Sequence, residues 1–158
     1  MNQAHKNGTN GQQQMVARPR LCRGVRGAIS VSENSVEAIV AATKELMTVL
    51  AAANQLHPDD IASIFFTTTS DLTAIYPALA VRQLGWYDVA MLCAHEMDVP
   101  GGMSGVIRVL LHWNTDKMAQ EIHHCYLGGA AALRPDRPLP MGMGDATKKW
   151  AHEGVQPC

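Results

Sequence analysis

Charged side chains are scarce in this 158-residue sequence: Asp, Glu, Lys and Arg make up 17% of it, and the net charge is −1. Soluble domains usually carry about a quarter of their residues as charges, so part of this surface is expected to lie in subunit interfaces. The 13 basic and 14 acidic residues nearly balance and form no basic stripe. We therefore expect no nucleic-acid partner.

Long apolar segments and paired cysteines are also missing. No apolar run approaches the roughly 20 residues of a membrane span, and the first 20 residues lack the apolar core of a secretory signal. The four cysteines are widely spaced, with no CxxC pair. These absences predict a cytoplasmic protein with reduced thiols and no membrane partner.

The common catalytic motifs are absent too. There is no G-x-S-x-G elbow for a nucleophilic serine, and the glycine pairs at 101–102 and 128–129 do not form a phosphate loop. The cluster Cys93, His95, Glu96 and Asp98 has the spacing C-x-H-E-x-D, which matches no standard zinc pattern. We therefore favour packing over metal coordination for Cys93, and predict no metal and no cofactor.

Composition divides the chain into three parts. Residues 1–19 are rich in Asn, Gln and Gly and are predicted to be a disordered extension. Residues 20–136 should form one folded domain, and the Pro- and Gly-broken residues 137–158 a flexible tail.

Hydrophobic periodicity within the domain predicts an α/β or α+β fold. Apolar residues recur every three or four positions between Ser35 and Asn54, which indicates an amphipathic helix. A second helix should run from Pro77 to Leu84, and a weak one over 116–122. Strands are predicted at 21–31, 61–69, 87–94, 105–113 and 123–133. The order predicts a mixed β-sheet with helices on one face, so a neighbouring subunit could cover the other.

Arg108 is the most informative single residue, because it lies between Ile107 and Val109 in an apolar strand. Burying an unpaired guanidinium costs several kcal/mol. Either Arg108 pairs with Glu96 or reaches the surface, or it converges with other arginines on an anionic ligand, which planar guanidinium groups bind well. The sequence alone leaves both interpretations open.

Five ordered motifs bring these residues together: "RGVRGA", "DLTAIYPALAVRQLGW", "CAHEMDVPGG", "IRVLLHW" and "YLGGAAALRPD". From about Arg23 to Asp136 they resemble the small monofunctional chorismate mutases of the bacillar type. The resemblance implies a trimeric pseudo-barrel of α/β subunits with active sites between neighbours. It also implies the Claisen rearrangement of chorismate to prephenate in aromatic amino-acid biosynthesis, which needs no nucleophile, metal or cofactor.

The resemblance further assigns roles to residues of this sequence. Arg108 matches the arginine at the substrate's ether oxygen, Glu96 the acceptor for the ring hydroxyl, and Arg26 a carboxylate and ether-side contact. The remaining matches are substrate-binding: Cys93 at the ring hydroxyl, Tyr126 at a carboxylate, Arg82 and Tyr76 from the adjacent subunit, and Leu133 and Arg134 at the start of a tail that orders over the substrate.

Some positions depart from the family pattern. Leu79 replaces a common lysine, Leu92 replaces a threonine, and Tyr76 replaces a phenylalanine, which puts the substrate affinity in question. Two alternatives remain at this stage. One is a non-catalytic trimer that binds a small carboxylate in the same clefts, and the other is a trimeric imine hydrolase of similar architecture.

Overall fold

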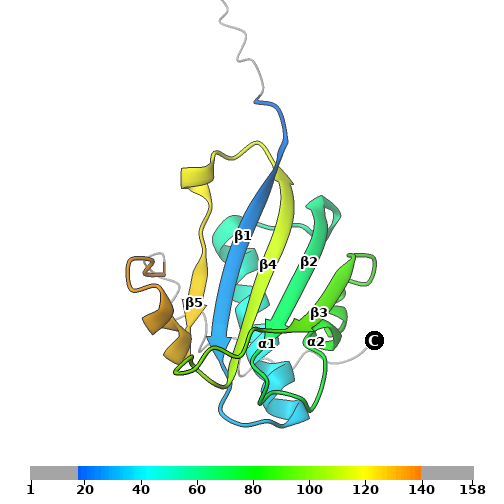
Figure 1. Ribbon diagram of the computed structural model, residues 1–158. Coiled ribbons are helices and arrows are strands. Elements are labelled where there is room, and N and C mark those ends of the chain that lie inside the picture. The colour runs from blue at the N-terminus through cyan, green and yellow to red at the C-terminus, as the bar shows by residue number, and fades with distance from the viewer. Residues whose placement is uncertain (1–17, 140–158) are drawn as a thin grey trace, which may run out of the picture.

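A five-stranded mixed sheet with helices behind it forms the body of the computed structural model, which describes residues 18–139 (Figure 1). The predictions for residues 1–17 and 140–158 lie outside this range. The strands are β1 (Leu21–Ser30), β2 (Ile61–Thr68), β3 (Met91–His95), β4 (Val106–Thr115) and β5 (Cys125–Leu127), in the order β3-β2-β4-β1-β5. The central strand β4 is antiparallel to β1 and β2, whereas β3 and β5 join parallel to β2 and β1.

The long helix α1 (Val36–Asn54) forms where the periodicity predicts it. Ser35 caps its first turn, because the hydroxyl accepts a hydrogen bond from the Ala38 amide at 3.2 Å. The helix ends where Gln55 takes a left-handed conformation, with φ of 59°. Between these ends α1 buries one face against the sheet, including Ile39, Leu46 and Leu50, which are fully buried. Both α1 and the short α2 (Ala78–Gln83) lie behind the sheet as drawn (Figure 1).

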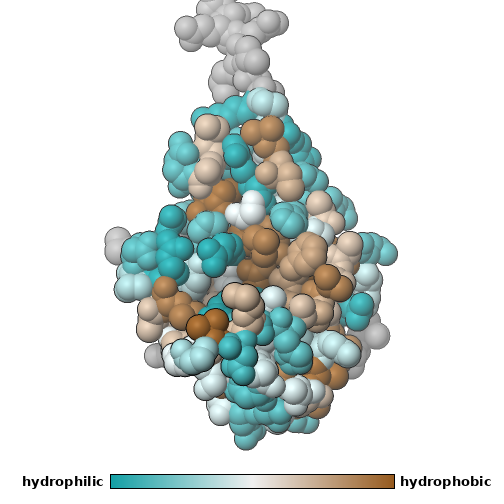
Figure 2. Space-filling view, viewed as in Figure 1, coloured by the Kyte–Doolittle hydropathy of each residue, from teal (hydrophilic) through white to brown (hydrophobic). Residues whose placement is uncertain are grey.

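The two faces of the sheet differ sharply because successive strand residues point to opposite sides. Val25 and Val109 belong to the core that α1 covers. On the opposite face, Phe65 is 39% and Leu92 57% exposed. Figure 2 shows hydrophobic residues gathered over the middle of this front face. The predicted arrangement, helices against one face of a mixed sheet, is confirmed.

The region after β4 departs from the prediction. The expected helix over 116–122 is only a 3-10 turn, Ala119–Glu121, because the Glu121 carboxylate accepts the Met118 amide and closes a tight loop. The expected strand over 123–133 stops after Leu127. There Gly128 adopts φ of 55°, and the Ser30 hydroxyl accepts the Gly129 amide, so the chain turns into the 3-10 helix Gly128–Leu133. The third strand also begins later than predicted, at Met91 rather than Tyr87.

Two further features concern the described part of the chain only. Between residues 18 and 139 no helix is long and apolar enough to cross a membrane. Cys22, Cys93 and Cys125 in the same range are free thiols.

The buried side chain of Asn54 joins the end of α1 to the segment that leads into β5. Its amide nitrogen donates to the carbonyls of Leu50 and His123, and its oxygen accepts the His123 amide at 2.8 Å. We expect Asn54→Ala to lower the free energy of unfolding by about 2–3 kcal/mol, because three hydrogen bonds of about 1 kcal/mol each are lost. Urea denaturation measures this change.

The next residue supplies a control of opposite sign. Gln55 holds a left-handed conformation that glycine adopts without strain, so Gln55→Gly should raise stability by about 0.5–1 kcal/mol. Equal behaviour of Asn54→Ala and Gln55→Gly would contradict the assigned role of Asn54.

Candidate active site

One row of residues crosses the whole sheet on the face away from α1. Ala28 of β1 lies opposite Arg108 of β4 and beside Tyr126 of β5. Arg108 in turn lies opposite Thr67 of β2, which is level with Ala94 of β3. Because aligned residues of neighbouring strands point to the same side, the side chains of Tyr126, Arg108 and Thr67 project from one face.

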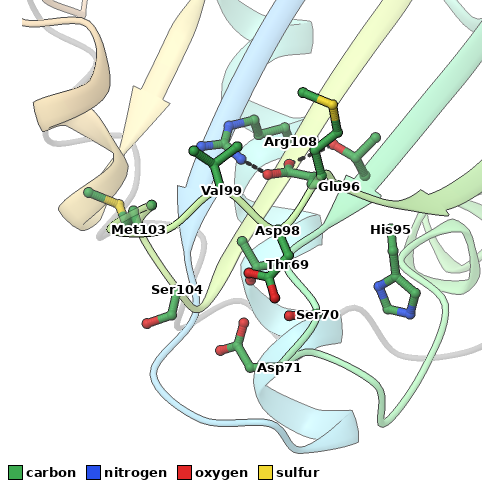
Figure 3. Close-up of a pocket in the computed structure, with 13 residues that line it drawn as sticks. Thr69, Ser70, Asp71, His95, Glu96, Asp98, Val99, Met103, Ser104 and Arg108 are labelled. Atoms are coloured by element: carbon green, nitrogen blue, oxygen red, sulfur yellow. Dashed lines mark hydrogen bonds and ion pairs between the residues drawn. The ribbon is translucent and has the colours of Figure 1, made fainter.

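Arg108 and Glu96 form an ion pair above this row (Figure 3). Glu96 follows the last residue of β3, and its amide donates to the Thr68 carbonyl at 2.9 Å, which extends the pairing with β2 by one step. The Arg108 side chain is 31% exposed and the Glu96 side chain 16%. The pairing that the apolar strand suggested is therefore present, and both charges remain accessible from one side.

That accessible side is a pocket of about 580 Å³. It is walled by the end of β2 with the turn after it, by the loop after β3, and by Arg108. Figure 3 shows Asp71, Asp98 and Ser104 around the lower part of the pocket, below the ion pair. The arrangement is a polar pocket with one cation and one carboxylate at its upper end.

Asp71 holds the floor of the pocket together. A hydrogen bond from the Thr69 hydroxyl, joined by backbone amides of Asp71 and Gly105, lowers the pKa of Asp71. The Gly105 amide donates to its carboxylate at 2.8 Å, and Gly105 itself has φ of 64°, which favours glycine. The ionised Asp71 therefore fixes the turn from which β4, and with it Arg108, begins.

Cys93 and Tyr76 line a second cavity, of about 350 Å³, at the β3 edge of the sheet. Cys93 is aligned with the buried Phe66, so it points to the helix side rather than to the Arg108 side. Burial raises the pKa of its thiol, although the Ala78 backbone and the nearby Arg82 charge oppose the shift. A protonated thiol suits a hydrogen-bond donor and not a nucleophile.

The other predicted residues lie around β1 and β5. Tyr126 is buried, its hydroxyl has no hydrogen-bond partner among the described residues, and Leu133 packs against the same small cluster. Arg134 makes two hydrogen bonds to Asp136, at 2.9 and 2.7 Å. Arg26 is exposed on β1, two positions before Ala28, and its side chain points to the same face.

A single chain thus brings Glu96 and Arg108 together but leaves Cys93, Tyr76 and Arg82 in a different place.

Comparisons with known proteins agree on one family. The model of "Chorismate mutase type I" matches residues 22–137. Chorismate mutase AroH of Thermus thermophilus is 46% identical over 117 residues, which are 73% of this chain and 96% of the relative. The Bacillus subtilis (strain 168) protein of the same name is 40% identical over 120 residues, 75% and 94% of the two chains. A solved chorismate mutase from Clostridium thermocellum has 47% identity and a TM-score of 0.69, and covers 70% of this chain and 98% of its own.

The chain belongs to the type I chorismate mutase family. Its function is that of a chorismate mutase, and the resemblance seen in the five motifs is confirmed. Neither the non-catalytic carboxylate-binding protein nor the imine hydrolase is supported by these comparisons.

The described residues contain no cluster of side chains arranged to coordinate a metal ion. Between residues 18 and 139, no three His, Cys, Asp or Glu side chains are grouped so as to hold an ion. Cys93 and Glu96 line different pockets, because the strand directs them to different sides.

Sequence reasoning missed three residues that line this pocket: Thr67, Thr69 and Asp71. All three lie at or just after the carboxyl end of β2, in the run "TTTSD". Polar residues that directly follow a buried strand are a usable signal, because they sit at the sheet edge where sites form. Thr67 was also recoverable from alternation, since it shares its face with the exposed Phe65.

His124 makes folding stability depend on pH. Its Nδ1 accepts the Arg26 amide at 3.1 Å, which continues the β1–β5 ladder beyond Cys125. Burial lowers the pKa of His124 below 6.5, and the charges of Arg137, Arg26 and Arg134, with His123, act in the same direction. At a pH between the lowered pKa of the folded state and the ordinary pKa of histidine, the unfolded chain binds a proton that the folded chain does not. Folding stability is therefore lost as the pH falls below the ordinary pKa of histidine.

We therefore expect the free energy of unfolding to decrease between about pH 7.5 and about pH 5.5, and to decrease less in His124→Asn, whose Oδ1 can replace Nδ1 as acceptor. Denaturant titrations at each pH give the slopes. His123→Asn, at an exposed neighbour, is the matched control. A His124→Asn slope equal to that of the wild type would refute this assignment.

Proposed function

We propose that this protein rearranges chorismate to prephenate in the pocket around Glu96 and Arg108. The observation that carries the proposal is the partly exposed Arg108–Glu96 pair at one end of a polar pocket of about 580 Å³. A Claisen rearrangement has no nucleophile and no proton transfer. The protein has to hold a flexible dianion in its compact conformer and stabilise the charge that separates as the ether C–O bond breaks.

Arg108 and Glu96 take complementary parts in this proposal. Arg108 stabilises the negative charge that develops on the ether oxygen. This interaction is stronger in the transition state than in the bound substrate. Glu96 accepts a hydrogen bond from the ring hydroxyl, and Arg26 contacts a carboxylate and the ether side. The pairing of Glu96 with Arg108 holds both charged groups in fixed positions, which supports preorganisation.

The remaining site residues are proposed to come from a second copy of the chain in a homotrimer. Cys93, Tyr76 and Arg82 lie at the β3 edge or on the helix side, away from the Arg108 pocket. Two copies side by side can place the β3 edge of one against the pocket of the next. Cys93 and Tyr76 would then orient the ring and Arg82 a carboxylate.

The uncovered face of the sheet supports the same assembly. Leu110 is level with Phe65, which is level with Leu92, and together these side chains form an apolar row. With Phe65 39% and Leu92 57% exposed, the row resembles half of an interface rather than a free surface. The low content of charged residues agrees with burial of this face between subunits.

Leu133 and Arg134 are proposed to begin a segment that closes over the substrate. In the structure Arg134 is bound to Asp136, so it has to exchange that carboxylate for one of the substrate. Both partners are exposed to solvent, which screens their attraction, so Arg134 can exchange one carboxylate for the other.

Replacing Arg108 tests the catalytic assignment. We expect Arg108→Ala to lower kcat by at least about 10²–10³-fold, because a preorganised transition-state charge is removed. Loss of chorismate absorbance measures the rate, with and without a chelator, and the wild type should be insensitive to the chelator. Arg20→Ala, at an exposed arginine in a separate cavity, is the control. A folded Arg108→Ala variant within threefold of wild type would remove the assignment.

Mixing two inactive variants tests the shared site. In a 1:1 mixture of Arg108→Ala and Arg82→Ala subunits, random exchange in a trimer restores both arginines at about a quarter of the sites. Activity should therefore rise above that of either variant alone, in step with subunit exchange followed by native mass spectrometry. Confirmed exchange without recovery would show that Arg82 and Arg108 do not act across an interface.

A further inference from the structure

The Thr67 hydroxyl donates a hydrogen bond of 2.7 Å to Oε1 of Glu96, while Arg108 occupies Oε2 of the same carboxylate. Among residues 18–139, each carboxylate oxygen therefore has one partner, and each keeps a lone-pair position for another donor. Hydrogen bonds from a hydroxyl to an ionised carboxylate are short and about twice as strong as neutral ones. Thr67 thus fixes the plane of the Glu96 carboxylate, which Arg108 alone, through one nitrogen, leaves free to turn.

The two side chains differ in stiffness. Glu96 follows the end of β3 and has three rotatable bonds, so by itself it can sample many orientations. Thr67 lies inside β2, and its branched Cβ restricts χ1 to few rotamers. It is also directly opposite Arg108 on β4. The rigid donor Thr67 on β2 and the cation Arg108 on β4 therefore hold the flexible carboxylate of Glu96 between them.

We infer that Thr67 is a positioning residue for catalysis: it aims the free lone pair of Glu96 into the pocket, toward the donor hydroxyl of the substrate. The inference rests on the proposed function of Glu96. Thr67 acts through Glu96, and it sets the direction of the carboxylate rather than its charge.

Two substitutions at position 67 separate the hydroxyl from the bulk of the side chain. Thr67→Val keeps the shape and the strand preference but removes the donor, and it should lower kcat/KM about 10-fold, the effect of losing one charge-assisted hydrogen bond of about 1.4 kcal/mol. Thr67→Ser keeps the hydroxyl and should stay within about threefold of wild type. Thr115→Val, at a buried threonine in the last position of β4, is the matched control and should leave the rate unchanged.

A double-mutant cycle with Glu96→Ala shows whether Thr67 acts through Glu96. If it does, adding Thr67→Val to Glu96→Ala should change kcat/KM by less than about twofold, whereas independent effects would multiply. A general weakening of the sheet would instead lower the rate equally in both backgrounds. Circular dichroism and the urea midpoint establish that each variant is folded.

The outcomes are distinct. A wild type that does not convert chorismate, or a Glu96→Ala variant as fast as wild type, would overturn the proposed function of the site. An active wild type with a slow Glu96→Ala, but with Thr67→Val at full rate or Thr67→Ser as slow as Thr67→Val, would overturn the inference alone. Should Glu96→Ala fall to the uncatalysed rate, the contrast between Thr67→Val and Thr67→Ser still decides it.

Discussion

A single positive charge near the start of the central strand β4 constrains much of the surrounding structure. β4 is paired on both sides, to β1 and to β2, so Arg108 is fixed in place by two neighbouring strands. A guanidinium there needs a carboxylate partner, and Glu96 supplies it from the loop after β3. The polar run after β2 then follows: Thr67 contacts Glu96, while Thr69 and Asp71 bind the turn from which β4 starts. The pocket is thus built from three strands that meet around one charge.

The same sheet explains why a lone chain is an incomplete catalyst in the proposed mechanism. Strand alternation sends Arg108 and Cys93 to opposite sides of the sheet, so in one chain the two side chains line different cavities. In the proposed homotrimer, a neighbouring copy supplies the second set of contacts. The apolar row of Phe65, Leu92 and Leu110 lies on the side that such a neighbour would cover. Assembly and completion of the site would then be one event, which links protein concentration to activity.

Sequence periodicity predicted the elements correctly where burial of a regular apolar face determines the structure. The helix from Val36 and the strands β1, β2 and β4 are long, with regular apolar spacing, and their ends lie within a few residues of the prediction. The prediction for residues 116–133 was wrong because single local interactions determine the conformation there. The Glu121 carboxylate closes a turn, and the Ser30 hydroxyl, by accepting the Gly129 amide, turns the chain away from the sheet. The pairing of Arg108 with Glu96 was one of the interpretations that the sequence left open, since a charge in an apolar strand needs a partner or a path to the surface. Thr67 was not singled out, because a threonine in a strand looks the same whether it packs or positions.

Charge balance gives the clearest reason for the distribution of arginines. Chorismate is a dianion, and Glu96 adds a further negative charge next to it, which is repulsive in a partly desolvated pocket. Arg108 offsets one of these charges, and the proposed contacts of Arg26, Arg82 and Arg134 offset the rest. Four of the eight arginines in a chain with few charges are therefore assigned to one ligand. Because Leu79 stands where a family lysine is common, the site lacks that additional cation, and each of the four arginines is expected to matter for binding.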